Sequence, residues 1–165
     1  MKLLNEIQIG RKIERLAIEI LENNYNEKEI ILAGVNNNGY SFAELIQEKL
    51  EKHDAKKKVS LTRINLSPAK PLEEEITIDK PAKELKNKVV IVVDDVANTG
   101  RTIFYAFKPL MNVLAKKIEV AVMVDRTHKS FPIKVDYMGM SLATTVEENI
   151  EVRIRGKRAW AVFLK

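Results

Sequence analysis

Residues 89–102 read VVIVVDDVANTGRT, and this stretch decides the fold of the sequence. Five β-branched residues in succession, Val89–Val93, are typical of a central parallel strand that is buried on both faces. An acidic pair, Asp94 and Asp95, ends the strand, and a loop of small residues then leads into a helix. Strand, loop and helix in this order predict an α/β fold with a mostly parallel central sheet flanked by helices. In such sheets ligands bind at the carboxyl ends of the strands, where the acidic pair lies.

The rest of the chain alternates between helical and strand patterns in the same way. Apolar residues at helical spacing predict helices over residues 6–24, around residues 42–50, and from about residue 102 to residue 114. Short apolar runs predict strands at residues 30–33, 59–64, 89–93, 120–124, 136–139, 151–154 and 159–164. A turn is expected at residues 155–157. An acidic, proline-containing stretch over residues 67–86 carries an EEEITID segment that is compatible with a strand. Without repeats or a linker rich in Gly and Ser, residues 1–165 are expected to form a single domain.

Composition excludes several classes of protein. Hydrophobic residues make up 45% of the 165 residues and charged residues 31%, a mixture that can bury a core. The absence of Cys excludes disulfides, zinc–thiolate sites and a thiol nucleophile, and a reducing, cytoplasmic compartment fits best. No apolar run approaches the roughly 20 residues that span a bilayer, so no membrane partner is expected. The net charge of +5 favours a polyanionic partner without identifying it.

The loop after the acidic pair has the composition of an anion site. Thr99 and Thr102 supply hydroxyl groups, and the loop supplies backbone N–H groups where a helix is expected to begin. The carboxylates of Asp94 and Asp95 would repel a phosphate but accept hydrogen bonds from vicinal hydroxyls. Together these groups point to a ribose 5-phosphate. The alternative is that the acidic pair only ends a strand; the G-x-x-x-x-G-K-[ST] pattern of a P-loop is absent.

Three segments carry a resemblance to a known family. VVIVVDDVANTGRT, together with ILAGVNNNGYSFAELI and VDRTHKSFPIKVDYMG, resembles the type I phosphoribosyltransferases over nearly the whole chain. The bacterial pyrimidine-operon attenuator proteins that double as uracil phosphoribosyltransferases are the most similar group, and the hypoxanthine-guanine enzymes are more distant. The resemblance implies transfer of a 5-phosphoribosyl group from phosphoribosyl diphosphate (PRPP) to a nucleobase, uracil ahead of a purine, with Mg²⁺ as cofactor. It also implies a flexible hood within about residues 65–87 and a homo-oligomer, a dimer or larger.

The resemblance assigns a role to each segment. The acidic pair, Asp94 and Asp95, would hold the ribose hydroxyls as the catalytic residues. The 5-phosphate would lie on the phosphate loop, which comprises Ala97, Asn98, Thr99, Gly100, Arg101 and Thr102. The pyrophosphate would contact Val35, Asn36, Asn37, Asn38 and Gly39, with a cis peptide near Asn36 in some states. The nucleobase would be bound by Asp125, Arg126, Tyr137 and Met138, with the Tyr137 ring stacked on it.

Two departures from the family keep other functions open. The relatives commonly carry Lys or Arg where this chain has Asn36, Asn37 and Asn38, and many have an acidic residue at the position of Asn98. A PRPP-binding protein that has lost turnover is therefore one alternative. An RNA-binding regulator that senses nucleotides is another, with phosphate contacts from Lys56, Lys57, Lys58, Arg153, Arg155, Lys157 and Arg158. In the plainest interpretation, these cations are solvated and Tyr137 and Met138 are ordinary strand residues.

Overall fold

A computed structural model describes residues 1–145, 147–154, 156 and 159–165 of the chain. The helices are α1 (Glu6–Asn23), α2 (Asn36–His53), α3 (Ala82–Leu85), α4 (Arg101–Ala106) and a 3₁₀ turn, η1 (Lys108–Asn112). The strands are β1 (Lys2–Leu4), β2 (Glu29–Val35), β3 (Lys58–Asn65), β4 (Thr77–Ile78), β5 (Val89–Ala97), β6 (Lys117–Arg126), β7 (Tyr137–Leu142), β8 (Ile150–Arg153) and β9 (Ala161–Leu164). The predicted alternation of helices and strands is confirmed.

The central sheet has the strand order β4-β3-β2-β5-β6-β7. β5 lies in its middle and pairs in parallel with β2 on one side and β6 on the other. β4 alone runs antiparallel, against β3. The run Val89–Val93 is fully buried. The sequence-based expectation of a mostly parallel sheet with this run at its centre is therefore correct.

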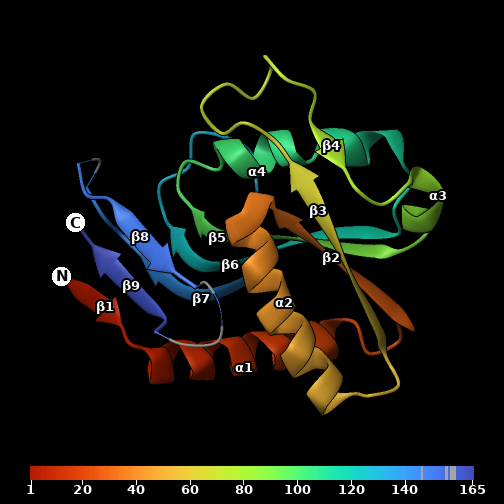
Figure 1. Cartoon of the computed structure of the whole chain (residues 1–165), viewed down its shortest axis with the longest axis horizontal. Coiled ribbons are helices and arrows are strands. Elements are labelled where there is room, and N and C mark those ends of the chain that lie inside the picture. The colour runs from red at the N-terminus through yellow and green to blue at the C-terminus, as the bar shows by residue number, and fades with distance from the viewer. Residues whose placement is uncertain (146, 155, 157–158) are drawn as a thin grey trace.

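Helices cover both faces of the central sheet (Figure 1). α1 and α2 pack on one face, where the apolar stripe of α1, from Ile9 to Ile20, joins the side chains of one face of β5. α4 and η1 pack on the other face through Ile103, Ala106 and Leu110. The inner strands β2, β5 and β6 are buried over most of their length, so their polar side chains gather at the ends of the strands. A site built on these strands is therefore expected at those ends.

A second, terminal sheet has the order β1-β9-β8 and is antiparallel. Both chain termini lie on it, side by side (Figure 1). The Met1 amino group donates to the Leu164 carbonyl at 2.5 Å, and the Leu164 N–H donates to the Met1 carbonyl at 2.7 Å. The sequence patterns predicted β8 and β9 but missed β1, which is three residues long.

Two local predictions differ from the structure, and a third is confirmed. The helix expected over residues 102–114 ends at Ala106 and continues as η1, because Pro109 has no N–H to donate to the preceding turn. The last strand begins at Ala161, and the turn predicted at residues 155–157 falls largely outside the described residues. The acidic stretch holds α3 and β4, and β4 lies within the EEEITID segment, which confirms the strand expected there. Within the described ranges, no helix is both long and apolar enough to cross a membrane.

Candidate functional site

A cavity of about 410 Å³ lies at the carboxyl edge of the central sheet and is the main cavity of the candidate site. Eight residues that the sequence singled out line it: Val35, Asn36, Asn37, Asn38, Asp94, Asp95, Asn98 and Thr102. Three further residues complete it: Pro68, Val96 and Ile150. The ends of β2 and β5 meet here because these strands are parallel neighbours. Segments that lie about 60 residues apart in the chain thus form one site.

The acidic pair supplies both of the carboxylates among the described residues that line the main cavity. Asp94 is 8% exposed, and its Oδ1 accepts the Asp95 N–H at 2.9 Å. Asp95 Oδ1 accepts the Val96 N–H at 2.8 Å. Burial, and then the neighbouring Asp95 charge, hold the pKa of Asp94 well above its usual range, and burial also raises the pKa of Asp95. Among the described residues that line this cavity there is neither Lys nor Arg. Because no basic side chain of the described lining pairs with these carboxylates, they can accept hydrogen bonds from hydroxyl groups or bind a cation.

The phosphate loop wraps around a small adjoining cavity of about 40 Å³, lined by residues 96–103. Gly100 has φ +87°, and a Cβ there would lie 2.6 Å from Cγ1 of Ile133, so only glycine fits. The Thr99 carbonyl accepts the N–H groups of Ser130 and Phe131 at 2.9 and 3.1 Å, which anchors the loop to the segment after β6. The conformation of Gly100 and these two hydrogen bonds therefore fix the shape of the loop around the small cavity.

The predicted polar loop Val35–Gly39 is in fact the end of β2 and the first turn of α2. Asn36 adopts φ +51°, and its side-chain amide makes two hydrogen bonds to the backbone of Leu66. Its Nδ2 donates to the Leu66 carbonyl at 2.9 Å, and its Oδ1 accepts the Leu66 N–H at 3.0 Å. Asn38 Nδ2 donates to Asp95 Oδ2 at 3.3 Å. In the described part of the chain every peptide bond is trans. We call Asn36, Asn37 and Asn38 the asparagine turn.

Tyr137 and Met138 do not face the main cavity, which corrects the sequence-based assignment. The Tyr137 side chain is fully buried in the core beneath α1, and its hydroxyl donates to Glu119 Oε2 at 2.8 Å. The side chain of Met138 packs on the opposite face, and its carbonyl accepts from Arg15 at 3.2 Å. Side chains alternate between the two faces of a strand, and here neither face reaches the edge where the ligand would lie.

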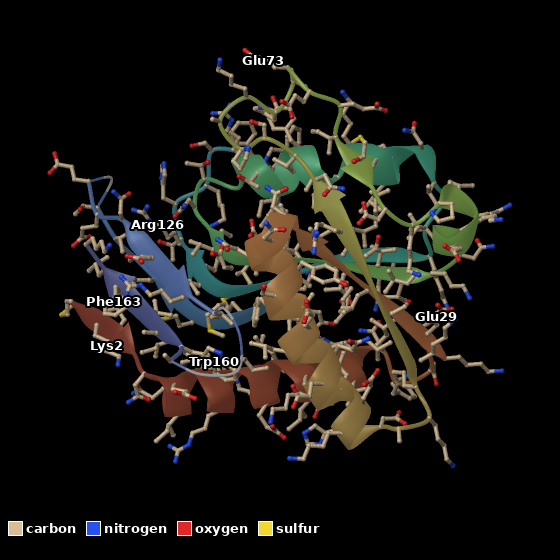
Figure 2. The ribbon with its side chains drawn as sticks, in the orientation of Figure 1. Lys2, Glu29, Glu73, Arg126, Trp160 and Phe163 are labelled. Carbon is tan, nitrogen blue, oxygen red and sulfur yellow. The ribbon has the colours of Figure 1, made fainter. Side chains whose placement is uncertain are left out.

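Ile150, at the start of β8, provides the apolar surface at the cavity that was expected from the Tyr137 ring. It lines the main cavity together with Pro68. No sequence pattern marks Ile150, because its position depends on how the terminal sheet lies against the end of β5. Pro68 belongs to the stretch expected to form the hood, whose tip carries Glu73, well away from the sheet (Figure 2). That this stretch closes over a ligand stays a prediction.

Asp125 and Arg126 end β6 beside a second cavity of about 430 Å³. Asp125 Oδ1 pairs with Lys129 Nζ at 2.6 Å. Arg126 reaches Thr144 Oγ1 at 2.6 Å and Asn98 Oδ1 at 3.4 Å, so it ties the phosphate loop to the chain beyond β7. Asn98 lines both cavities, which makes them neighbouring parts of one site.

The cations proposed for RNA contacts differ in their surroundings. Lys57 is 7% exposed, and its ammonium group donates to the carbonyls of Asn24 and Glu27. Lys58 pairs with Glu29 at 3.4 Å. Arg153 pairs with Glu151 at 2.6 Å. Lys57 is therefore structural, which corrects that part of the prediction, and Lys56 is exposed. Arg155, Lys157 and Arg158 lie outside the described residues.

Fold and site together define an α/β protein in which a glycine-containing loop at the start of a helix lies beside a buried acidic pair. The sequence matches the model of the phosphoribosyl transferase domain over residues 2–154, and the chain belongs to this family.

The chain is similar to known proteins over most of its length and theirs. The bifunctional protein PyrR of Clostridium acetobutylicum is 34% identical over 161 residues, covering 94% of this chain and 90% of that protein. PyrR of Macrococcus caseolyticus is 31% identical, covering 92% and 90%. Among solved structures, the hypoxanthine phosphoribosyltransferase of Trypanosoma cruzi has a TM-score of 0.76 at 17% identity, covering 98% and 94%. A hypoxanthine-guanine phosphoribosyltransferase of Bacillus anthracis has a TM-score of 0.73 at 21% identity, covering 91% and 86%. At these identities the structural likeness concerns the fold.

Proposed function

We propose that the protein is a nucleobase phosphoribosyltransferase that transfers the 5-phosphoribosyl group of PRPP to a ring nitrogen of a nucleobase, with uracil favoured over a purine. The observation that carries this proposal is the meeting of the acidic pair and the phosphate loop at one cavity. Membership in the phosphoribosyl transferase family supports it, and so does the similarity to PyrR proteins.

Each part of the main cavity has a place in this reaction. The phosphate loop binds the 5-phosphate, and the acidic pair accepts hydrogen bonds from the ribose hydroxyls. The asparagine turn faces the pyrophosphate, and Ile150 with Pro68 provides an apolar wall for the base. A bond forms between the base nitrogen and C1 of the ribose, while the bond from C1 to the pyrophosphate oxygen breaks. The protein contributes chiefly by positioning the reactants and by excluding water.

Mg²⁺ is the cofactor we propose, and the residues present fit it. Carboxylate and amide oxygens are the hard donors that this ion prefers. Within the described residues no group of three or more His, Cys, Asp or Glu side chains gathers to hold a metal. Asp94 and Asp95 would therefore hold the ion jointly with oxygens of the substrate. When bound, Mg²⁺ neutralises charge on the departing pyrophosphate.

Asn98 lines the main cavity where an acidic residue would serve as a general base. An amide cannot remove a proton from the nucleobase at neutral pH. Uracil has a weakly acidic ring N–H, for which the lack of a strong general base matters less, so Asn98 is compatible with uracil as the substrate.

A panel assay tests the proposal. Purified protein is mixed with PRPP, Mg²⁺ and one of uracil, hypoxanthine, guanine or adenine, and released pyrophosphate is measured. We expect release with uracil above all others. If no base supports release, transfer is excluded as the function.

The second candidate function is an RNA-binding regulator, favoured by the bifunctional relatives and by a net charge of +5. Binding of single-stranded RNA would be measured by fluorescence anisotropy between 50 and 200 mM salt. Contacts to phosphate require affinity to fall as salt rises. Affinity that does not respond to salt contradicts this function. Analytical ultracentrifugation of the same sample tests whether the protein is a dimer or a larger homo-oligomer, as expected. A cytoplasmic location stays a prediction.

A further inference from the structure

The loop between β3 and β4, residues 66–76, places Pro68 in the wall of the main cavity. Further along this β3–β4 loop, residues 72–75 are exposed to solvent. Exposed loops are the more mobile parts of a fold unless specific contacts hold them. The position of Pro68 at the cavity therefore depends on the contacts made by the residues on either side of it.

Asn36 holds the first residue of the β3–β4 loop. Its side-chain amide donates to the Leu66 carbonyl at 2.9 Å and accepts the Leu66 N–H at 3.0 Å. Two residues that face each other in an antiparallel sheet exchange the same pair of hydrogen bonds. Because both bonds come from one planar amide, they fix the orientation of the Leu66 backbone as well as its position. The Leu66 side chain packs against the core on the α4 side of the sheet.

The backbone that carries Asn36 is itself tightly packed. A Cβ at Gly39 would lie 2.4 Å from the Val93 carbonyl oxygen of β5, and a Cβ at Gly34 would lie 2.4 Å from the backbone N of Tyr40. Asn36 has φ +51°, a conformation that asparagine adopts more readily than most other residues. The asparagine turn is therefore fixed against the central strand, and the Asn36 side chain links the β3–β4 loop to this fixed point.

A second contact holds the loop on the other side of Pro68 in the sequence. Arg101 Nη2 donates to the Ala69 carbonyl at 3.2 Å. Arg101 is exposed, whereas Asn36 and Leu66 are half-buried. A single hydrogen bond from a long, exposed side chain holds a backbone less firmly than a half-buried pair of bonds does. The contact between Asn36 and Leu66 is therefore the main determinant of where Pro68 lies.

We propose that Asn36 is a positioning residue, which keeps Pro68 against the nucleobase by holding Leu66, and that it is not a ligand of the pyrophosphate. The proposal rests on the proposed function, in which Pro68 and Ile150 form the apolar wall beside the base. When Pro68 moves away, the base is held less tightly and water gains access to C1 of the ribose. A bond then forms between C1 and the water oxygen while the bond from C1 to the pyrophosphate breaks. A proton passes to solvent, and the products are ribose 5-phosphate and pyrophosphate.

Hydrogen exchange of the full chain without substrate, followed by mass spectrometry, tests whether Asn36 holds the loop. Asn36→Gly removes both hydrogen bonds and keeps a residue that adopts positive φ freely. We expect peptides that contain residue 66 to exchange at least about tenfold faster in this variant, and peptides from β5 to be unchanged. Asn87→Gly is the matched control, because Asn87 is exposed, has φ +59° and precedes β5 at its amino end. Unchanged exchange at residue 66 in Asn36→Gly contradicts the proposal.

Steady-state assays of the same variants test whether holding the loop matters for transfer. With the base that the protein uses, Asn36→Gly should raise the KM for the base about tenfold. It should raise the ratio of ribose 5-phosphate to nucleotide by a similar factor, whereas the KM for PRPP should stay within about threefold. Asn87→Gly should match the original protein in all three, and thermal unfolding checks that both variants are folded.

The outcomes separate the positioning role from the proposed function. If exchange at residue 66 rises while the KM for the base and the product ratio stay the same, the positioning role is wrong and the transferase function stands. If the KM for PRPP rises and the KM for the base does not, Asn36 binds the pyrophosphate and the proposal is overturned. If the original protein releases no pyrophosphate with any base, the proposed function fails and the positioning role fails with it.

Discussion

Two buried carboxylates, Asp94 and Glu119, lie near opposite ends of the parallel strands, and their surroundings differ. Asp94 and Glu119 are each 8% exposed. Glu119 accepts the Tyr137 hydroxyl at 2.8 Å and Asn24 Nδ2 at 3.1 Å, and Lys117 Nζ lies 3.5 Å away. Asp94 accepts one backbone N–H and has a second carboxylate, Asp95, as its neighbour. Burial alone therefore does not mark a functional carboxylate. A buried carboxylate without a compensating cation, at the wall of a cavity, does.

Neutralising each carboxylate in turn and measuring ligand binding should give the largest difference between the two positions. The double change Asp94→Asn and Asp95→Asn removes charge-assisted hydrogen bonds to the ribose hydroxyls, each worth about 1.5–3 kcal/mol. We expect affinity for uridine 5′-monophosphate to fall by about a hundredfold, or about 2.7 kcal/mol, in calorimetry. Glu119→Gln is the matched control and should bind normally. Unchanged binding in the double variant would show that the acidic pair is not the ribose site.

At the amino end of the strands, a change near Glu119 should lower the stability of the protein and leave its nucleotide affinity unchanged. Tyr137→Phe deprives buried Glu119 of its hydroxyl donor, which should lower the free energy of unfolding by about 1–3 kcal/mol. Nucleotide affinity should stay within about twofold. Urea denaturation and calorimetry on the same preparation measure both. Tyr25→Phe, at an exposed position, should change neither. A variant at Tyr137 that loses nucleotide affinity while keeping its stability would restore the original assignment of this ring to the base.

The pH dependence of stability distinguishes the two carboxylates in another way. Burial raises the pKa of Asp94, so the folded chain holds this proton more tightly than the unfolded chain does. The resulting stability is fully present below the unfolded pKa of about 3.9 and is lost as the pH rises through the higher folded value. Asp94→Asn keeps the acceptor for the Asp95 N–H and removes the charge. The variant should therefore be more stable than the original protein at pH 8, and the difference should shrink as the pH falls.

Denaturation at several pH values between 5 and 8 measures that difference. A constant difference between Asp94→Asn and the original protein across this range would show that the burial of Asp94 is compensated in the folded state. Asp136→Asn provides a control at a carboxylate that accepts the Val120 N–H at 2.8 Å at the amino edge of the sheet.

Where the signal is local, the sequence predicts which residues the structure brings together at the carboxyl ends of the central strands. The β-branched run of β5, the acidic pair and the glycine of the phosphate loop follow one another within 14 residues, and each is defined by its own side chain or backbone conformation. Family resemblance then places the asparagine turn beside them. These predictions need no knowledge of how distant segments pack.

The errors concern which face a side chain occupies. A strand predicted at residues 136–139 does not reveal which of its faces lies under α1, and a shift of one residue exchanges the faces. The family resemblance assigns the Tyr137 ring to the base, whereas its hydroxyl donates to Glu119 in the core. Ile150 was missed because its place at the cavity depends on the docking of the terminal sheet. Lys57 belongs to a basic run that predicts solvent exposure, yet its ammonium group donates to the carbonyls of Asn24 and Glu27 in the connection between α1 and β2.

Ile150 therefore gives the finest test of the corrected site. Ile150→Ala removes part of the apolar wall beside the base, and because the side chain is half-buried the loss should be about 1 kcal/mol, or roughly fivefold in KM for the nucleobase. The KM for PRPP and the kcat should change little, because Ile150 does not belong to the phosphate loop or the acidic pair. Steady-state assays of pyrophosphate release measure all three values. Ile118→Ala, which is 41% exposed at the amino edge, is the matched truncation and should leave them unchanged. If KM for the base is unaffected by Ile150→Ala, the base must lie against the second cavity, between Arg126 and Thr144, rather than against β8.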